Sequence, residues 1–168
     1  MVSKTNLPTV ECKNLQSAFR NPDIVDNLTK QEVDTGYLKG AFEKPPVDMY
    51  RVSLIGIVDI QEKKRLIVDL SSLHDNEEHS SINNLIDKEQ YSLSYVRIDD
   101  AISAIKDFER FSILSKVDIS DACKQLGIKK DQHRLYCIKW RKLYYYYVRL
   151  CFGSRSSSII FHKLSVAI

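Results

Sequence analysis

The apolar positions of this chain recur at intervals that change from segment to segment, and those intervals predict both helices and strands. Apolar side chains at the helical interval of three or four residues occupy residues 21–35, 100–108 and 154–168. Asn21 is placed to cap the first of these helices, and Pro22 fits its first turn. Asp99 or Asp100 is placed to cap the second.

Runs rich in β-branched and aromatic residues predict strands. The stretches of this kind are residues 52–60, 64–70, 111–117, 133–140 and 142–150. The first two should pair as a hairpin around a charged turn. The last two should form another hairpin, with Arg141 and Lys142 near its tip. The middle strand should end at Asp118.

The order of these elements predicts one α+β domain without internal boundaries. No long linker rich in Gly, Ser or Pro interrupts the sequence, and it contains neither repeats nor low-complexity tracts. Residues 1–20 should form a loosely ordered N-terminal arm before a folded segment of residues 21–168. The polar stretch at residues 71–81 should be a charged loop, and we assign it no chemistry.

The overall composition predicts an ordinary soluble globular protein. Apolar residues make up 43% and charged residues 28% of the 168 residues. No apolar run reaches the length of about 18 residues that spans a membrane, and no signal peptide opens the chain. The cysteines are widely spaced, which argues against a disulfide framework or a zinc site. We therefore expect a cytoplasmic or nuclear location and no membrane partner.

Charge is distributed unevenly along the chain. From Ala122 onward, ten Lys or Arg residues accompany one acid, a formal charge of +9, whereas the first 121 residues carry fifteen bases and twenty-one acids, a formal charge of −6. The basic part also contains Trp140 and four consecutive tyrosines at residues 144–147. Cations interleaved with aromatic rings suit a phosphate backbone with stackable bases. The alternative is a hairpin face that is simply solvated.

Asp118 is the residue that most directly suggests chemistry. It follows a predicted strand and precedes residues typical of a turn or a helix start. A carboxylate in that position can hold a metal ion, whereas an Asp at a strand end more often makes a hydrogen bond within a turn. The residue alone leaves both interpretations open.

Three segments in a fixed order favour the metal-binding interpretation. They read KKRLIVDLS at residues 63–71, KVDISDAC at residues 116–123 and LCFGSRSSSIIF at residues 150–161. In this order they resemble the reverse transcriptases, most closely those of DIRS-type (tyrosine-recombinase) retrotransposons. The resemblance covers nearly the whole chain from about Glu11. It implies the fingers and partial palm of a right-hand DNA or RNA polymerase fold, with an incomplete palm sheet.

The resemblance also implies roles in metal-dependent nucleotidyl transfer. Asp118 would be the first catalytic carboxylate and would bind Mg²⁺ together with the backbone carbonyl of Ile119. Arg65 would lie against the incoming base and reach its phosphates. Phe152 and Gly153 would form the turn at the nucleotide pocket, where glycine allows close backbone approach. The implied partners are an RNA or DNA template-primer and a deoxynucleoside triphosphate.

The chain departs from the family pattern at several positions. Cys123 stands where the family has Phe or Tyr against the ribose of the bound nucleotide, which should weaken discrimination against ribonucleotides. Taken alone, Cys123 is a small buried hydrophobe. Cys151 and Ser158 replace two prolines, which should soften the nearby turn. The family's fourth motif, an aromatic-x-Asp-Asp strand, is absent from the sequence.

These features predict a fragment of a retrotransposon reverse transcriptase, an RNA-directed DNA polymerase, truncated before the aromatic-x-Asp-Asp motif. Two-metal catalysis needs further carboxylates, so the isolated chain should be inactive. The alternatives are a noncatalytic nucleic-acid-binding protein and a structural relic. The cations expected to contact a nucleic-acid backbone are Lys139, Arg141, Lys142 and Arg155.

Overall fold

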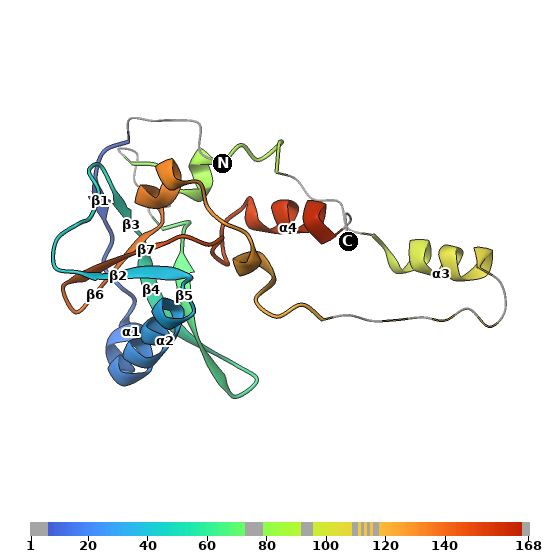
Figure 1. Cartoon of the computed structure of the whole chain (residues 1–168), viewed down its shortest axis with the longest axis horizontal. Coiled ribbons are helices and arrows are strands. Elements are labelled where there is room, and N and C mark those ends of the chain that lie inside the picture. The colour runs from blue at the N-terminus through green and yellow to red at the C-terminus, as the bar shows by residue number, and fades with distance from the viewer. Residues whose placement is uncertain are drawn as a thin grey trace.

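The computed structural model describes residues 7–72, 79–91, 96–108, 111, 113, 115 and 118–165. The α-helices are α1 (Gln16–Arg20), α2 (Pro22–Asp34), α3 (Ile98–Asp107) and α4 (Ser157–Ser165), and the 3-10 helices are η1 (Asn83–Leu85), η2 (Ala122–Gln125) and η3 (Lys130–Leu135). The strands are β1 (Val10–Glu11), β2 (Leu38–Phe42), β3 (Arg51–Val52), β4 (Leu54–Ile60), β5 (Lys63–Asp69), β6 (Cys137–Trp140) and β7 (Leu143–Tyr147). The expected mixture of helices and strands is confirmed (Figure 1).

A five-stranded mixed sheet lies at the centre of the fold, in the order β1-β3-β6-β7-β2. β3 runs parallel to both β1 and β6, whereas β7 pairs antiparallel with β6 and with β2. The β6–β7 hairpin turns at Arg141 and Lys142, whose φ angles of 47° and 67° suit a tight two-residue turn. The expected second hairpin is therefore present, with shorter strands.

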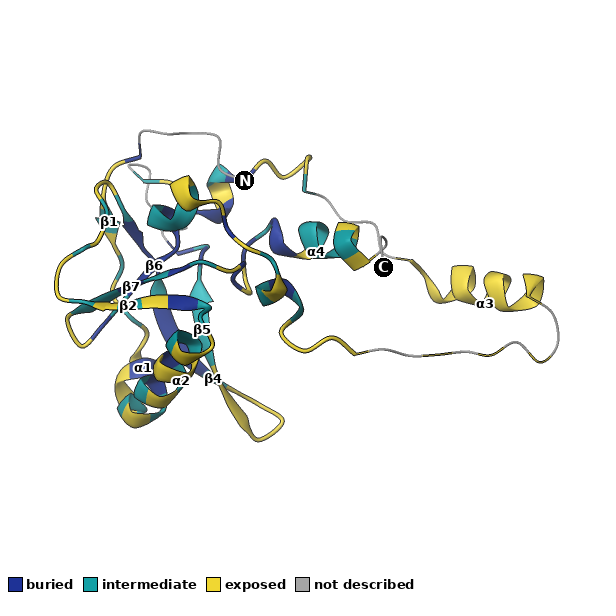
Figure 2. Cartoon of the chain, in the orientation of Figure 1, coloured by how far each residue is buried: buried dark blue, intermediate teal, exposed yellow. Residues whose placement is uncertain are grey.

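The chain leaves this sheet at Ser53 and continues into β4, which pairs with β5 as a separate antiparallel hairpin. Its turn is formed by Gln61 and Glu62, again with positive φ angles, of 49° and 64°. The base of β4 is buried, whereas both strands are exposed near the turn (Figure 2). The hairpin thus carries residues 63–65 away from the core.

Helix α2 contributes its apolar side to the core that includes the sheet. Val25 is fully buried, and Leu28 and Val33 pack against the same cluster. Along β7, Tyr145 and Tyr147 are buried in this cluster, because alternate residues of a strand point to opposite sides of a sheet. The tyrosines between and before them are half-buried on the other side.

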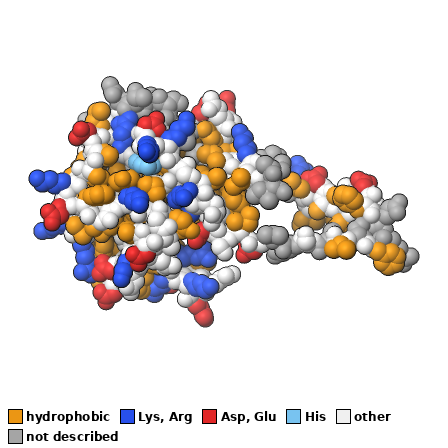
Figure 3. Space-filling view, viewed as in Figure 1, with side chains coloured by type: hydrophobic (Ala, Val, Ile, Leu, Met, Phe, Trp, Pro, Cys, Tyr) orange, Lys and Arg blue, Asp and Glu red, His pale blue; other side chains and the backbone are white. Residues whose placement is uncertain are grey.

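Helix α3 lies apart from the rest of the fold (Figure 1), and all of its residues are exposed. Hydrophobic side chains are visible on this projecting part in Figure 3. The helix begins at Ile98 with Arg97 at the N-cap, so the expected cap at Asp99 or Asp100 is wrong. The carboxylate of Asp100, inside the first turn, accepts a hydrogen bond of 2.8 Å from the backbone N–H of Arg97. Among the described residues, no helix combines the length and the apolar character that a membrane crossing requires.

The N-terminal segment differs from the loose arm expected for residues 1–20. In the described part, residues 7–20, β1 pairs with β3 and α1 packs beside β4. The Asn14 side chain accepts a hydrogen bond from the Ile55 N–H and donates one to the Lys139 carbonyl, over 3.0 Å and 2.8 Å. Asn21 does not cap α2 with its side chain, which instead donates to the Ser17 carbonyl over 2.9 Å.

The strand expected at residues 111–117 is not formed by the described residues there. Phe111 has a positive φ of 76°, and Ile113 is 97% exposed. A strand needs a neighbouring strand to satisfy its backbone, and residues 111, 113 and 115, the described part of this segment, belong to no strand of the central sheet. Asp118 itself belongs to no strand, and the residues directly before it, 116 and 117, lie outside the described part of the chain. Residues 133–135, expected to begin the second hairpin, belong to η3 instead.

Candidate functional site

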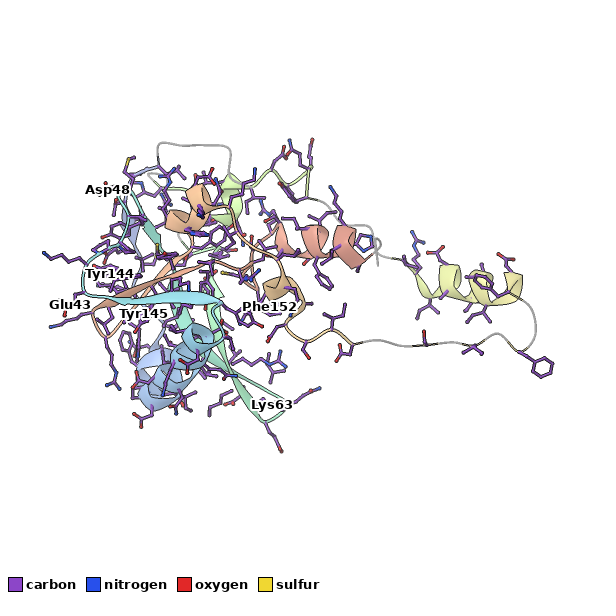
Figure 4. The ribbon with its side chains drawn as sticks, in the orientation of Figure 1. Glu43, Asp48, Lys63, Tyr144, Tyr145 and Phe152 are labelled. Atoms are coloured by element: carbon purple, nitrogen blue, oxygen red, sulfur yellow. The ribbon has the colours of Figure 1, made fainter. Side chains whose placement is uncertain are left out.

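An open groove of about 730 Å³ is formed by α2, the tip of the β4–β5 hairpin and the segment that begins at Asp118. Arg65, Asp118, Ile119 and Phe152 all line it. Residues that the sequence assigns to nucleotide binding therefore meet in one space, although they come from three distant segments. Figure 4 shows Lys63 near the tip of the β4–β5 hairpin and Phe152 in the body of the fold.

The hairpin presents two positive charges to this groove. Arg65 is exposed on β5 and makes no hydrogen bond or ion pair with another described residue. Lys63 is also unpaired within the described chain, whereas Lys64 forms an ion pair with Asp59, Nζ to Oδ2 2.9 Å. Lys63 and Arg65 point the same way because they are two positions apart on one strand. Both charges are available to an anionic ligand.

Asp118 offers an exposed carboxylate to the lining of the same groove. It makes no hydrogen bond or ion pair within the described chain. Asp121 follows in a left-handed conformation, with φ 51°, and accepts a hydrogen bond of 3.5 Å from the Tyr37 hydroxyl. The described residues include no cluster of three or more His, Cys, Asp or Glu side chains that could hold a metal ion. One carboxylate and neighbouring carbonyl oxygens still suit Mg²⁺, which commonly keeps waters and substrate phosphates as its other ligands.

An ion pair between Lys124 and Glu32 forms part of the groove lining. Their side chains are only 13% and 16% exposed. The Lys124 ammonium also lies over the rings of Tyr37 and Phe152, 5.2 Å and 6.0 Å from the ring centres. The pair fixes η2, just after Asp118, against α2. Sequence reasoning missed both residues because neither belongs to a motif and they lie 92 positions apart.

The turn at Gly153 is held from outside by Asn83. The Asn83 amide donates to the Gly153 carbonyl and accepts from the Arg155 N–H, each over 2.8 Å. Gly153 has a φ of 91°, and a Cβ there would lie 3.1 Å from the carbonyl oxygen of Val68. The turn also borders a cavity of about 320 Å³ that shares Phe152 with the groove. These contacts restrain the turn, although Cys151 and Ser158 stand where the resembled family has prolines.

Cys123 is placed in the core and not in the groove. It is 8% exposed and is not one of the residues that line the groove. Burial raises the pKa of its thiol. The small-hydrophobe interpretation of this residue therefore fits its surroundings better than contact with a bound nucleotide.

The cations expected to contact a nucleic-acid backbone lie mostly in internal contacts. Lys139 pairs with Glu11, Nζ to Oε2 2.7 Å, and Arg141 pairs with Asp26, Nη2 to Oδ2 2.7 Å. Arg155 donates from its guanidinium to a backbone carbonyl over 3.2 Å. Lys142 is exposed at the β6–β7 turn and has no ion-pair partner in the described chain. None of these four residues lines the groove.

The tyrosines of β7 are also engaged within the fold. Tyr144, which is half-buried and is labelled in Figure 4, donates to Glu11 over 2.9 Å. The Tyr146 ring stacks with Phe42 and with His133, its centre 5.9 Å and 5.3 Å from theirs. Tyr145 and Tyr147 are buried, and burial raises the pKa of both hydroxyls. The four rings therefore act first as packing groups.

Comparison with known proteins finds similarity at the level of structure. No family model and no curated protein matches the chain. The structure of a foamy viral protease-reverse transcriptase in complex with dsDNA matches 99% of this chain and 28% of its own, with a TM-score of 0.57 and 15% identity. The fold is reverse-transcriptase-like. A mutant of the prototype foamy virus protease-reverse transcriptase and its native form match with TM-scores of 0.56 and 0.51, at 11% and 12% identity.

The similarity extends along the whole chain but covers a small share of the viral proteins. This chain spans 28%, 20% and 19% of the lengths of the three matched structures. A mixed α/β fold with a mixed sheet, similar to reverse transcriptase, agrees with the fold class expected from the sequence at this coarser level.

Proposed function

We propose that this chain is the fingers and partial palm segment of a retrotransposon reverse transcriptase, with the DIRS-type enzymes as its nearest group. The shared groove carries the proposal. Arg65, Asp118 and Phe152 lie in separate motifs, and all three line one open space. The reverse-transcriptase-like fold supports the same assignment.

In this proposal the groove binds a deoxynucleoside triphosphate beside an RNA or DNA template-primer. Arg65 and Lys63 attract the phosphates, since both are exposed cations without acidic partners in the described chain. Phe152 offers an exposed ring to the base. Asp118 and the carbonyl of Ile119 would hold Mg²⁺, which when bound neutralises charge on the transferred phosphate. Lys124 and Glu32 keep the segment after Asp118 in place.

The isolated chain should bind these ligands without polymerising them. Nucleotidyl transfer by two metal ions requires at least two convergent carboxylates. The motif comparison assigns Asp118 to that role and no second residue of this sequence. A noncatalytic nucleic-acid-binding role is therefore the second candidate, and the unpaired charges of Lys63 and Arg65 favour it.

Primer extension tests the proposal. The isolated chain, incubated with Mg²⁺, a primed template and deoxynucleotides, should incorporate nothing. A longer product that carries an aromatic-x-Asp-Asp strand should extend the primer, and Asp118→Asn should remove that activity almost completely, while Asp99→Asn on exposed α3 should not. Binding without incorporation by the longer product would favour the noncatalytic role. Incorporation by the isolated chain that disappears in Asp118→Ala would contradict its expected inactivity.

A further inference from the structure

The cavity of about 320 Å³ beside the Gly153 turn adjoins the groove without being part of it. The two spaces share four lining residues: Glu32, Leu66, Lys124 and Phe152. Pockets that bind small molecules usually measure about 300–1,000 Å³. A cavity of about 150 Å³ already holds one benzene ring. This cavity therefore has room for two fused rings.

Most of the cavity lining is apolar. Leu66 and Val68 of β5 pack against the core, and Tyr147 and Cys151 are buried in it. Phe152 adds a ring that is 56% exposed. Apolar surface in contact with water favours a ligand that covers it.

The charges in the lining disfavour an ionic ligand. Lys124 is the only Lys or Arg among the described residues that line the cavity, and it already pairs with Glu32. An anion would therefore find no free positive charge. The Asp69 carboxylate accepts a hydrogen bond of 2.8 Å from the Ser71 N–H of its own turn. A cation would have to lose its water and compete with Lys124 for Glu32, so the lining suits an uncharged molecule.

One polar group of the lining is buried and has no partner among the described residues. Tyr147 is 3% exposed, and its hydroxyl makes no hydrogen bond with another described residue. Burial raises the pKa of this hydroxyl well above its ordinary value, so it keeps its proton. Buried polar groups in native proteins nearly always have a hydrogen-bond partner. A ligand that accepts from Tyr147 would supply one.

We propose that this cavity binds an uncharged heteroaromatic molecule of two fused rings, whose ring nitrogen accepts a hydrogen bond from the Tyr147 hydroxyl. The rings would cover the apolar side chains of Leu66, Val68 and Phe152. The site stands on the cavity alone and does not depend on the proposed function. Because Phe152 lines both spaces, a bound ligand would also contact a side chain that shapes the groove.

Titration with quinoline, followed by calorimetry or NMR, tests the ligand class. Quinoline is uncharged at neutral pH and should bind with a Kd of about 0.1–1 mM. Tyr147→Phe removes the donor and should weaken binding about fivefold. Quinoline-6-carboxylate and protonated 6-aminomethylquinoline keep the ring nitrogen but carry a charge, and each should bind at least about tenfold more weakly.

Three further variants test the location. Val68→Phe fills the cavity at a position that does not line the groove, and it should abolish quinoline binding. Val96→Phe, the same change at an exposed position, should retain it, and so should Arg65→Ala, which alters the groove alone.

A measurement on the wild type keeps the proposal testable if Val68→Phe does not fold. The methyl resonances of Leu66 and Val68 should shift during the titration, whereas that of Val96 should not. Absence of binding at low millimolar quinoline, or equal affinity in Tyr147→Phe, would overturn the proposal. Binding that survives in Val68→Phe but is lost in Arg65→Ala would also overturn it, because quinoline would then lie in the groove.

Discussion

Arg141 Nη2 lies 2.7 Å from Oδ2 of Asp26, and Trp140 donates its indole N–H to the other oxygen of the same carboxylate, also over 2.7 Å. This contact joins the tip of the β6–β7 hairpin to α2. Further ion pairs of the described residues join the basic C-terminal part to the acidic N-terminal part: Lys139–Glu11, Lys124–Glu32 and, at 4.0 Å, Arg141–Asp23. The separation of charge along the sequence therefore helps to hold the two parts of the fold together.

This arrangement predicts which cations give nucleic-acid binding its salt dependence. Each neutralised phosphate of a single strand contributes a slope of about −0.7 to log affinity against log salt. Replacing Lys63 and Arg65 together by Ala should therefore flatten the slope by about 1.4. Replacing Lys139 and Arg141 should change it less, because both are already paired with acids. Fluorescence anisotropy of a labelled oligonucleotide across a salt series measures both slopes.

Comparing the two double variants controls for the general effect of net charge. Each removes two positive charges, so a general effect of net charge should be equal in both. If replacing Lys139 and Arg141 flattens the salt dependence more than replacing Lys63 and Arg65 does, the ion pairs of Lys139 and Arg141 open to bind the ligand. A slope of zero in the wild type would show that binding does not involve phosphate contacts at all.

Breaking the Lys124–Glu32 pair should destabilise the fold. Both side chains are largely buried, so Glu32→Ala leaves an ammonium group without its counter-charge. The free energy of unfolding should fall by about 1–3 kcal/mol, measured by urea denaturation. The double replacement Glu32→Gln and Lys124→Met should cost less, because no buried charge remains. Glu43→Ala, at an exposed position, should be neutral.

The sequence predicts local elements well because their signals are local. α2 starts at Pro22, and the two hairpins turn where charged residues interrupt β-branched and aromatic runs. The expected strand at residues 111–117 had the same composition. Its described residues Phe111 and Ile113 are 92% and 97% exposed. Apolar content shows that a segment can form a strand, but it does not show that a neighbouring strand is present to pair with it.

The sequence predicts only those residues of the candidate site that belong to recognisable motifs. Motif residues such as Arg65 and Asp118 do come together in the groove. The contacts that hold the groove in shape are invisible in the sequence, since Asn83 acts on a turn 70 positions away. The basic neighbours of Lys139 predict a phosphate ligand, whereas its actual partner Glu11 is 128 positions distant. Charge counts along a chain cannot separate a ligand contact from an internal ion pair.

Acid should weaken the hydrogen-bonded cluster around Glu11. Burial alone would raise the pKa of this carboxyl, but hydrogen bonds from Lys139, Tyr50 and Tyr144 together place it below the ordinary value of 4.5. A carboxyl with a lowered pKa contributes stability that is fully present above its unfolded-state pKa and is lost as the pH falls through its folded-state pKa. The melting temperature should therefore drop below about pH 4.5.

The variant Glu11→Gln isolates this contribution from that of other carboxyl groups. It keeps the size of the side chain but cannot titrate, so its melting temperature should be lower at neutral pH and should depend less on pH in the acid range. Asp34→Asn, at an exposed residue, should follow the wild type. Parallel curves for the wild type and Glu11→Gln would show that the cluster contributes no acid sensitivity.

Two glycines in left-handed conformations should respond differently to alanine. Gly36 has a φ of 73° and Gly153 a φ of 91°, and a left-handed L-residue costs about 1–2 kcal/mol. A Cβ at Gly36 would meet no described atom within 4 Å, whereas at Gly153 it would lie 3.1 Å from the Val68 carbonyl oxygen. The position of the added Cβ and that of the Val68 carbonyl oxygen are both set by the backbone, so no side-chain rotation can relieve the contact. Gly153→Ala should therefore lower the free energy of unfolding by about 1 kcal/mol more than Gly36→Ala.

Oligonucleotide binding separates the role of the Gly153 turn in the groove from its role in stability. At a temperature where both variants are fully folded, Gly153→Ala should weaken binding, because the turn must move away from β5 and carries Phe152 with it. Gly36 lies between the groove residues Thr35 and Tyr37, but a Cβ there meets nothing within 4 Å, so Gly36→Ala moves no neighbour and should bind as the wild type does. If Gly153→Ala loses stability but keeps its affinity, the Phe152 side of the groove does not contact the nucleic acid, and binding rests on Lys63 and Arg65 alone.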